Sequence, residues 1–238
     1  MNLERVTVRG SVRLAGLAYA PRDPRSGLCV IVSHGFTASK ESVDLLASYL
    51  AGRGYPALTF DFRGHKLGAS EGDLTHASQT LEDLGAASGF AVHYFQVKRC
   101  VLVGHSMGAM VSLLVGAAMP ECIGAAAVTT GMQPSRGFEQ PVGQAMLSQR
   151  ADYISGAQPM ELLKEFDELA AAWPGMGDKP TLLVAAKGDV VIKPSRVREL
   201  ADRAGNNVEF AEIEGSHLEA PNRARGVVAN WLDKSFRD

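Results

Sequence analysis

The chain has 238 residues, of which 46% are hydrophobic and 21% are charged, a balance typical of a soluble globular protein. Its formal net charge of −2 gives no excess of positive charge for attracting nucleic acid or an anionic membrane. No run approaches the roughly 18 apolar residues of a membrane-spanning helix, and residues 1–5 lack the basic-then-apolar layout of a secretory signal. We therefore expect a cytoplasmic protein with no nucleic-acid partner and no membrane insertion.

The sequence predicts an N-terminal hairpin, followed by alternating strands and helices. Segments 3–8 and 12–19 alternate in polarity and meet at Gly10-Ser11, which predicts an antiparallel hairpin. Most later predicted strands are almost continuously apolar, so we expect a mostly parallel sheet with helices on both faces and the hairpin at one edge. The predicted strands are 28–33, 57–61, 100–103, 123–130, 181–186 and 208–213, and the predicted helices are 41–52, 78–94, 109–118, 195–204 and 222–235.

This alternation breaks between residues 132 and 175, which we call the cap segment. A stretch of about 40 residues without a strand is too long for an ordinary connection and favours a functional insertion. Within it, Pro159 begins a run of apolar residues at helical spacing that continues to Trp173, and Pro174-Gly175 ends the predicted helix. We expect one domain, residues 1–238, with a small helical cap at 132–175.

A candidate nucleophile lies at Gly104-His105-Ser106-Met107-Gly108, between an apolar strand and an apolar helix. A serine on a tight strand-to-helix turn, with a glycine two residues away on each side, is typical of a nucleophile elbow with a strained backbone. Ser70 has the same glycine spacing, but it lies in a polar stretch with no strand before it, so we interpret it as a loop residue. Ser106 is therefore the candidate nucleophile.

A serine hydroxyl needs a positioned base, and the base needs an acidic partner. Of the six histidines, His217 lies just after the last predicted strand, where loop residues gather at the edge of a sheet. Asp189 follows strand 181–186 in the same way, whereas Asp167 lies on the predicted cap helix and is expected to be solvated. The chain order Ser106, Asp189, His217 is the order found in α/β-hydrolases.

A tetrahedral intermediate at Ser106 would need backbone N–H donors for its oxyanion. We expect one from Met107 and the other from the loop 33–37, with Phe36 as the candidate. No C-x-x-C, H-E-x-x-H or strand-linked G-x-G-x-x-G motif is present, so we predict no metal and no cofactor. Three cysteines cannot all pair, and Cys29 and Cys100 begin predicted strands, so we expect reduced core thiols.

Four stretches resemble the α/β-hydrolase branch that includes serine aminopeptidase-like hydrolases, feruloyl (cinnamoyl) esterases, monoacylglycerol lipases and acyl thioesterases. They are H-G-F-T-A-S-K-E from His34, D-F-R-G-H from Asp61, S-E-G from Ser70, and the elbow G-H-S-M-G from Gly104. The resemblance implies an α/β-hydrolase fold with Ser106, Asp189 and His217 as nucleophile, acid and base, and an oxyanion hole completed by the H-G-F-T loop.

The same resemblance has one departure and one ambiguous cluster. The family usually reads R-G-H-G-x-S-x-G, whereas Lys66-Leu67 intervene here before Gly68, so we expect an altered pocket. We interpret Asp61, Arg63 and His65 as structural, with Asp–Arg hydrogen bonds tying the loop.

These features together predict a cofactor-independent serine esterase, feruloyl esterase-like, that cleaves esters of apolar acyl or aromatic acids through an acyl-enzyme. An acyl thioesterase is an alternative with the same chemistry, and a triad-retaining small-molecule receptor or signalling protein is an alternative from another class. The sequence also leaves a homodimer open. Phe138, Met146, Tyr153, Phe166 and Trp173 could contact the acyl group, although we expect most of them to pack the cap onto the sheet, and Arg136, Arg150 and Lys164 could meet the phosphates of a thioester carrier.

Overall fold

An eight-stranded sheet runs through the centre of the computed structural model, which describes residues 1–25 and 27–236. The strand order is β1-β2-β4-β3-β5-β6-β7-β8. The first two strands pair with each other in antiparallel fashion, β2 is also antiparallel to β4, and the remaining pairs are parallel. The strands are β1 (Asn2–Arg9), β2 (Arg13–Ala20), β3 (Leu28–Ser33), β4 (Ala57–Phe60), β5 (Arg99–His105), β6 (Cys122–Val128), β7 (Thr181–Ala186) and β8 (Val208–Ile213).

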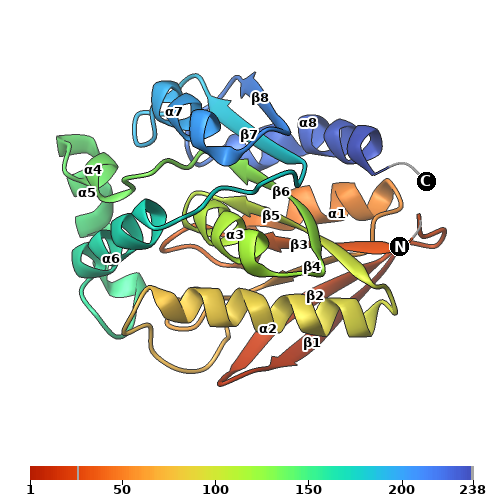
Figure 1. Cartoon of the computed structure of the whole chain (residues 1–238). Coiled ribbons are helices and arrows are strands. Elements are labelled where there is room, and N and C mark those ends of the chain that lie inside the picture. The colour runs from red at the N-terminus through yellow and green to blue at the C-terminus, as the bar shows by residue number, and fades with distance from the viewer. Residues whose placement is uncertain (26, 237–238) are drawn as a thin grey trace.

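Helices cover both faces of the sheet, as the sequence predicted (Figure 1). A short 3-10 helix, η1 (Lys40–Val43), leads into α1 (Asp44–Gly52), which packs with α8 (Ala220–Ser235) on one face. The other face carries α2 (Ser78–Tyr94), α3 (Met107–Ala118) and α7 (Pro194–Ala204). In the part of the chain that the structure describes, no helix is both long enough and apolar enough to cross a membrane.

The pleat of the strands explains why their sequences are apolar at nearly every position. Along β3, Val30 and Val32 pack into the core cluster that contains α1 and α8, while Cys29 and Ile31 face α2 and α3. Successive side chains of a strand point to opposite faces, so a strand covered on both faces needs apolar residues at both. The three thiols, including Cys29, are buried and unpaired, as expected.

The cap segment lies at the end of the sheet where β5 leads into α3 (Figure 1). Its elements are α4 (Ser135–Phe138), α5 (Pro141–Gln149), the 3-10 helix η2 (Ala151–Tyr153) and α6 (Pro159–Ala171). The predicted helix is confirmed as α6, which begins at Pro159. Phe166 and Trp173 are buried in the core clusters, so these two aromatic residues pack the cap onto the sheet.

One prediction for the cap segment is wrong. Asp167 is half-buried and not freely solvated, and its carboxylate accepts hydrogen bonds from the Ser135 backbone N–H (3.0 Å) and hydroxyl (2.5 Å). The first N–H groups of a helix have no partner within the helix, so a carboxylate from a neighbouring helix can satisfy one of them. Asp167 of α6 thereby fixes the start of α4.

Candidate active site

Ser106 lies on a tight turn between β5 and α3 with φ 54° and ψ −115°, the strained conformation that the sequence predicted. The turn leaves no room for side chains at its two flanking glycines. A Cβ atom on Gly104 would lie 2.2 Å from the Gly108 carbonyl oxygen, and one on Gly108 would lie 2.5 Å from the His34 carbonyl oxygen. The Ser106 N–H also donates to the carbonyl of Val128 on β6 (2.9 Å). The strained turn is therefore fixed both by the close packing at its glycines and by a hydrogen bond to the neighbouring strand.

The structure brings the predicted hydroxyl, imidazole and carboxylate together. His217 Nε2 lies 3.0 Å from Ser106 Oγ, and His217 Nδ1 lies 2.6 Å from Asp189 Oδ2. The other carboxylate oxygen of Asp189 accepts the backbone N–H groups of Val191 (2.8 Å) and Ile192 (2.7 Å). Because the carboxylate accepts a hydrogen bond from Nδ1–H, the Nδ1 atom keeps its proton and the lone pair of Nε2 is free to accept the Ser106 hydroxyl proton.

His105, the residue before Ser106, lies against the His217 imidazole. Its Nε2 donates to the main-chain carbonyl of His217 (2.9 Å), and the two ring centroids are 4.8 Å apart. Burial, and then the proximity of His217, lower the pKa of His105 well below its usual value, so the His105 ring stays neutral. Sequence reasoning did not find this contact, because nothing in the elbow motif shows which loop the His105 side chain reaches.

The loop that follows β3 packs directly against the elbow. A Cβ atom on Gly35 would lie 3.3 Å from Ser106 Cβ, and Thr37 adopts a positive φ of 59° as the loop turns. In residues 1–25 and 27–236, neither the Phe36 nor the Met107 N–H donates to another protein group. Since Met107 is the first residue of α3, its N–H is one of the free donors at the positive end of a helix.

A cavity of about 390 Å³ opens above Ser106, within the usual size range of small-molecule sites. Of the cap side chains proposed to contact an acyl group, Phe138 and Met146 line it. Of the three cations proposed to meet a carrier's phosphates, Arg150 lines it, whereas Arg136 and Lys164 do not. The remaining lining residues are Gly35, Phe36, Thr37, Ala38, Ser39, Glu41, Ser42, Leu45, Leu67, His105, Leu147, His217, Leu218, Pro221 and Asn222.

The family model described as serine aminopeptidase, S33, matches residues 24–165, which is more than half of the chain. The chain belongs to this family. The S33-family hydrolase is also 22% identical over 239 residues to a Mycoplasma genitalium protein with an esterase/lipase designation, a match that covers 85% of this chain and 88% of that one.

Solved structures of similar shape support the same fold. An esterase from Pyrococcus furiosus has a TM-score of 0.77 at 21% identity, covering 99% of this chain and 92% of its own. The esterase domain of a Rhodothermus marinus protein has a TM-score of 0.72 at 22% identity, covering 98% and 99%. An α/β serine hydrolase homologue from Coxiella burnetii has a TM-score of 0.70 at 20% identity, covering 100% and 99%. The S33-family hydrolase therefore has the α/β-hydrolase fold that its motifs implied.

In the S33-family hydrolase, buried polar contacts fasten the loop after β3 to the end of β4. The Phe62 N–H donates to His34 Nε2 (3.1 Å), so Nδ1 carries the proton and donates to the Gly35 carbonyl (2.8 Å). Burial lowers the pKa of His34 to about 4. Lys40 donates to the fully buried Asp61 carboxylate through its backbone N–H (2.8 Å) and its ammonium group (2.7 Å). Hydrogen bonds thus join the motif H-G-F-T-A-S-K-E to the motif D-F-R-G-H.

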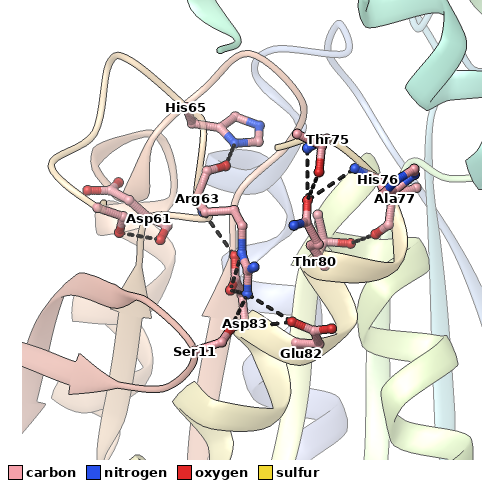
Figure 2. A network of polar contacts seen from close by, with 12 residues as sticks. Ser11, Asp61, Arg63, His65, Thr75, His76, Ala77, Thr80, Glu82 and Asp83 are labelled. Atoms are coloured by element: carbon pink, nitrogen blue, oxygen red, sulfur yellow. Dashed lines mark hydrogen bonds and ion pairs between the residues drawn. The ribbon is translucent and has the colours of Figure 1, made fainter. Parts of the chain in front are cut away.

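Arg63 and His65 have the structural surroundings expected of them (Figure 2). The Arg63 guanidinium donates twice to Asp83 Oδ1 of α2 (2.9 and 2.6 Å) and once to the Ser11 hydroxyl of the hairpin (2.8 Å). The predicted Asp–Arg hydrogen bonds therefore involve Asp83, while the cation that pairs with Asp61 is a lysine. His65 Nδ1 donates to the Arg63 carbonyl (3.0 Å), and burial lowers the pKa of His65 to about 3.

Proposed function

We propose that the chain is a serine carboxylesterase in which Ser106, His217 and Asp189 are nucleophile, base and acid. The observation that carries the proposal is the position of the His217 ring, 3.0 Å from the Ser106 hydroxyl on one side and 2.6 Å from the Asp189 carboxylate on the other. A base held between a hydroxyl and a carboxylate in this way can activate the hydroxyl and be stabilised when it becomes protonated.

The proposed reaction has two half-reactions. In the first, Ser106 Oγ attacks the ester carbonyl carbon while His217 Nε2 takes its proton, and the oxyanion accepts hydrogen bonds from the Phe36 and Met107 N–H groups. His217 then gives the proton to the leaving alkoxide oxygen, the C–O bond breaks, and the acyl group remains on Ser106. In the second, water attacks the acyl-enzyme with the same base, which releases the carboxylic acid and restores the serine.

The lining of the cavity supports an apolar substrate. Phe36, Phe138, Met146 and Leu147 lie around Ser106, so the part of the ester in the cavity would be an apolar acyl or aromatic acid group, as in feruloyl esterases. We also propose that residues 1–238 form one domain in which the cap segment, 132–175, selects the substrate. The esterase names of structurally similar proteins agree with this activity.

An acyl thioester is the second candidate substrate, because Arg150 lines the cavity. A carrier's phosphates would need several cations, and of the three that the sequence offered, only this one lies at the site. Arg136 and Lys164 are exposed elsewhere on the cap. The geometry therefore favours an oxygen ester.

The test compares Ser106→Ala with Ser70→Ala, the serine in the second G-x-S-x-G sequence, on p-nitrophenyl acetate and butyrate. Loss of the nucleophile should lower kcat by about a millionfold and abolish the burst of p-nitrophenol. Among the described residues, the Ser70 hydroxyl bonds only to the Asp61 carbonyl and the Ala15 N–H, so Ser70→Ala should keep its activity within about tenfold. Activity retained in Ser106→Ala would refute the acyl-enzyme, and a wild-type protein that binds these esters without a burst would favour a receptor.

A further inference from the structure

Three half-exposed leucines converge on the mouth of the cavity. All three line the cavity, and each is a little more than half exposed. They are Leu45 of α1 (54%), Leu67 of the loop after β4 (53%) and Leu218 of the loop before α8 (56%). A single exposed leucine on a protein surface is ordinary, but apolar residues gathered at one place mark a binding surface. We call these three residues the leucine rim.

Leu67 is held in place at the rim by its neighbours on both sides. The Lys66 N–H donates to the Tyr153 carbonyl of the cap segment (2.8 Å). On the other side, a Cβ atom on Gly68 would lie 2.3 Å from the Asp61 carboxyl carbon, so the chain passes tightly over a buried side chain there. The Lys66-Leu67 insertion is thus a short turn fixed at both ends, and it places a leucine side chain at the mouth of the cavity.

The two charged side chains of the cavity lining already have partners. Glu41 pairs with the Lys40 ammonium group at 2.9 Å. The Arg150 guanidinium lies 5.8 Å from the centroid of the Tyr153 ring, within the range of a cation–π contact. Both charged side chains therefore already interact with other residues. The leucine rim is the part of the mouth that leaves apolar surface exposed and without a partner among the described residues.

We propose that the leucine rim binds the alkyl chain of the ester substrate where that chain emerges from the cavity, and that Leu67 is a specificity-determining residue. The inference rests on the proposed ester hydrolysis at Ser106. A chain long enough to reach the rim removes leucine surface from water, whereas a short chain leaves that surface hydrated. The enzyme should therefore favour esters whose alkyl chains extend past the cavity. This preference should depend on Leu67, which the Lys66-Leu67 insertion places at the rim.

The kinetic test measures kcat/KM for p-nitrophenyl acetate and for p-nitrophenyl octanoate, with the octanoate below its critical micelle concentration. The variants are Leu67→Ala and Leu45→Ala, and the control is Leu3→Ala on β1, which is 52% exposed and does not line the cavity. The octanoate-to-acetate ratio should fall about three- to tenfold in both rim variants, because truncation removes part of the surface that only the longer chain covers. It should stay at the wild-type value in Leu3→Ala. An unchanged ratio in the rim variants would overturn the proposal. Wild-type activity on octanoate that rises only above the critical micelle concentration would also overturn it, because the rim would then bind a lipid surface.

A binding measurement separates this proposal from the proposed function. Calorimetric titration of methyl octanoate into Ser106→Ala, and into the same variant with Leu67→Ala added, reports the rim without turnover. The second variant should bind the ester about three- to tenfold more weakly. If it does so although the wild type hydrolyses no ester, the subsite stands and the proposed function fails. Equal affinities would refute the subsite whatever the activity.

Discussion

His105 Nε2 donates a hydrogen bond to the main-chain carbonyl of His217 at 2.9 Å, across 112 positions of the chain. The residue beside the candidate nucleophile therefore holds the loop that carries the candidate base. Because burial keeps His105 neutral, this link does not place a second positive charge beside His217 when His217 takes up a proton. One side chain of the elbow thus sets the position of the imidazole relative to the Ser106 hydroxyl.

The first prediction follows from this contact. His105→Leu removes the donor and should lower kcat/KM by about tenfold to a hundredfold, because a small misplacement of a base from its reacting proton is costly. His105→Gln places an amide N–H near the position of Nε2 and should recover most of the activity. Steady-state kinetics on p-nitrophenyl butyrate, with thermal unfolding midpoints measured beside them, provide the check. Equal losses in two folded variants would mean that the ring, and not its hydrogen bond, matters.

The second prediction concerns Asp189. In Asp189→Asn the amide N–H₂ would donate to Nδ1 and force the proton onto Nε2, which then could not accept the Ser106 proton. The expected loss in kcat is about 10⁴-fold, because the wrong tautomer cannot act as the base. The variant should remain folded, since the side-chain oxygen can still accept the Val191 and Ile192 N–H groups.

The matched control for Asp189→Asn is Asp202→Asn on the exposed surface of α7. It makes the same chemical change away from the cavity, so its kcat should stay at the wild-type value. Burst kinetics and the pH dependence of kcat would be measured for both variants. A loss of less than about tenfold in Asp189→Asn would contradict the role of Asp189 as the acid.

The sequence was sufficient for the sheet and for the candidate nucleophile because both depend on local patterns. Apolar runs predicted the strands, and the glycine spacing around Ser106 predicted the strained turn. The contacts His105–His217 and Lys40–Asp61 could not be predicted in the same way, since they depend on which loops meet at the edge of the sheet. In the cap segment, α6 was predicted from its apolar stripe. By contrast, α5 buries only Gly143, so its sequence carries no comparable stripe.

The third prediction compares two glycines, Gly104 in β5 and Gly85 in α2, at which an added methyl group meets different surroundings. A Cβ atom on Gly104 would lie 2.2 Å from a backbone oxygen, and backbone cannot move aside cheaply, so Gly104→Ala should lower the free energy of unfolding by about 3 kcal/mol. Gly85 lies in the interior of α2 with nothing within 4 Å of the added atom. Gly85→Ala should therefore raise the free energy of unfolding by about 0.5–1 kcal/mol through helix propensity. Urea unfolding of both variants gives the comparison, and two variants that change stability in the same direction would contradict it.

The fourth prediction concerns the pH dependence of stability, to which His34 and His65, two of the buried histidines near the candidate active site, should contribute. Burial lowers the pKa of His34 to about 4 and that of His65 to about 3, from an unfolded value near 6.5. Between these values the unfolded chain binds protons that the folded chain does not, so stability rises with pH there. As pH falls below about 6.5, each histidine should lower the free energy of unfolding, by about 2 kcal/mol at pH 5.

His65→Phe isolates one of these contributions, because phenylalanine fits among the rings of His34, Phe36 and Phe62 and does not titrate. Its absolute stability will differ from that of the wild type, so the informative quantity is the change between pH 7 and pH 5. Urea unfolding should show that this change is smaller by about 2 kcal/mol in His65→Phe, since the unfolded variant has one fewer site to protonate. His93→Gln removes an exposed histidine and should leave the change as in the wild type. If His65→Phe keeps the wild-type pH dependence, His65 must be protonated in the folded chain at pH 5. The Nε2 atom of His65 is buried and has no hydrogen-bond partner among the described residues, so it must then have gained one.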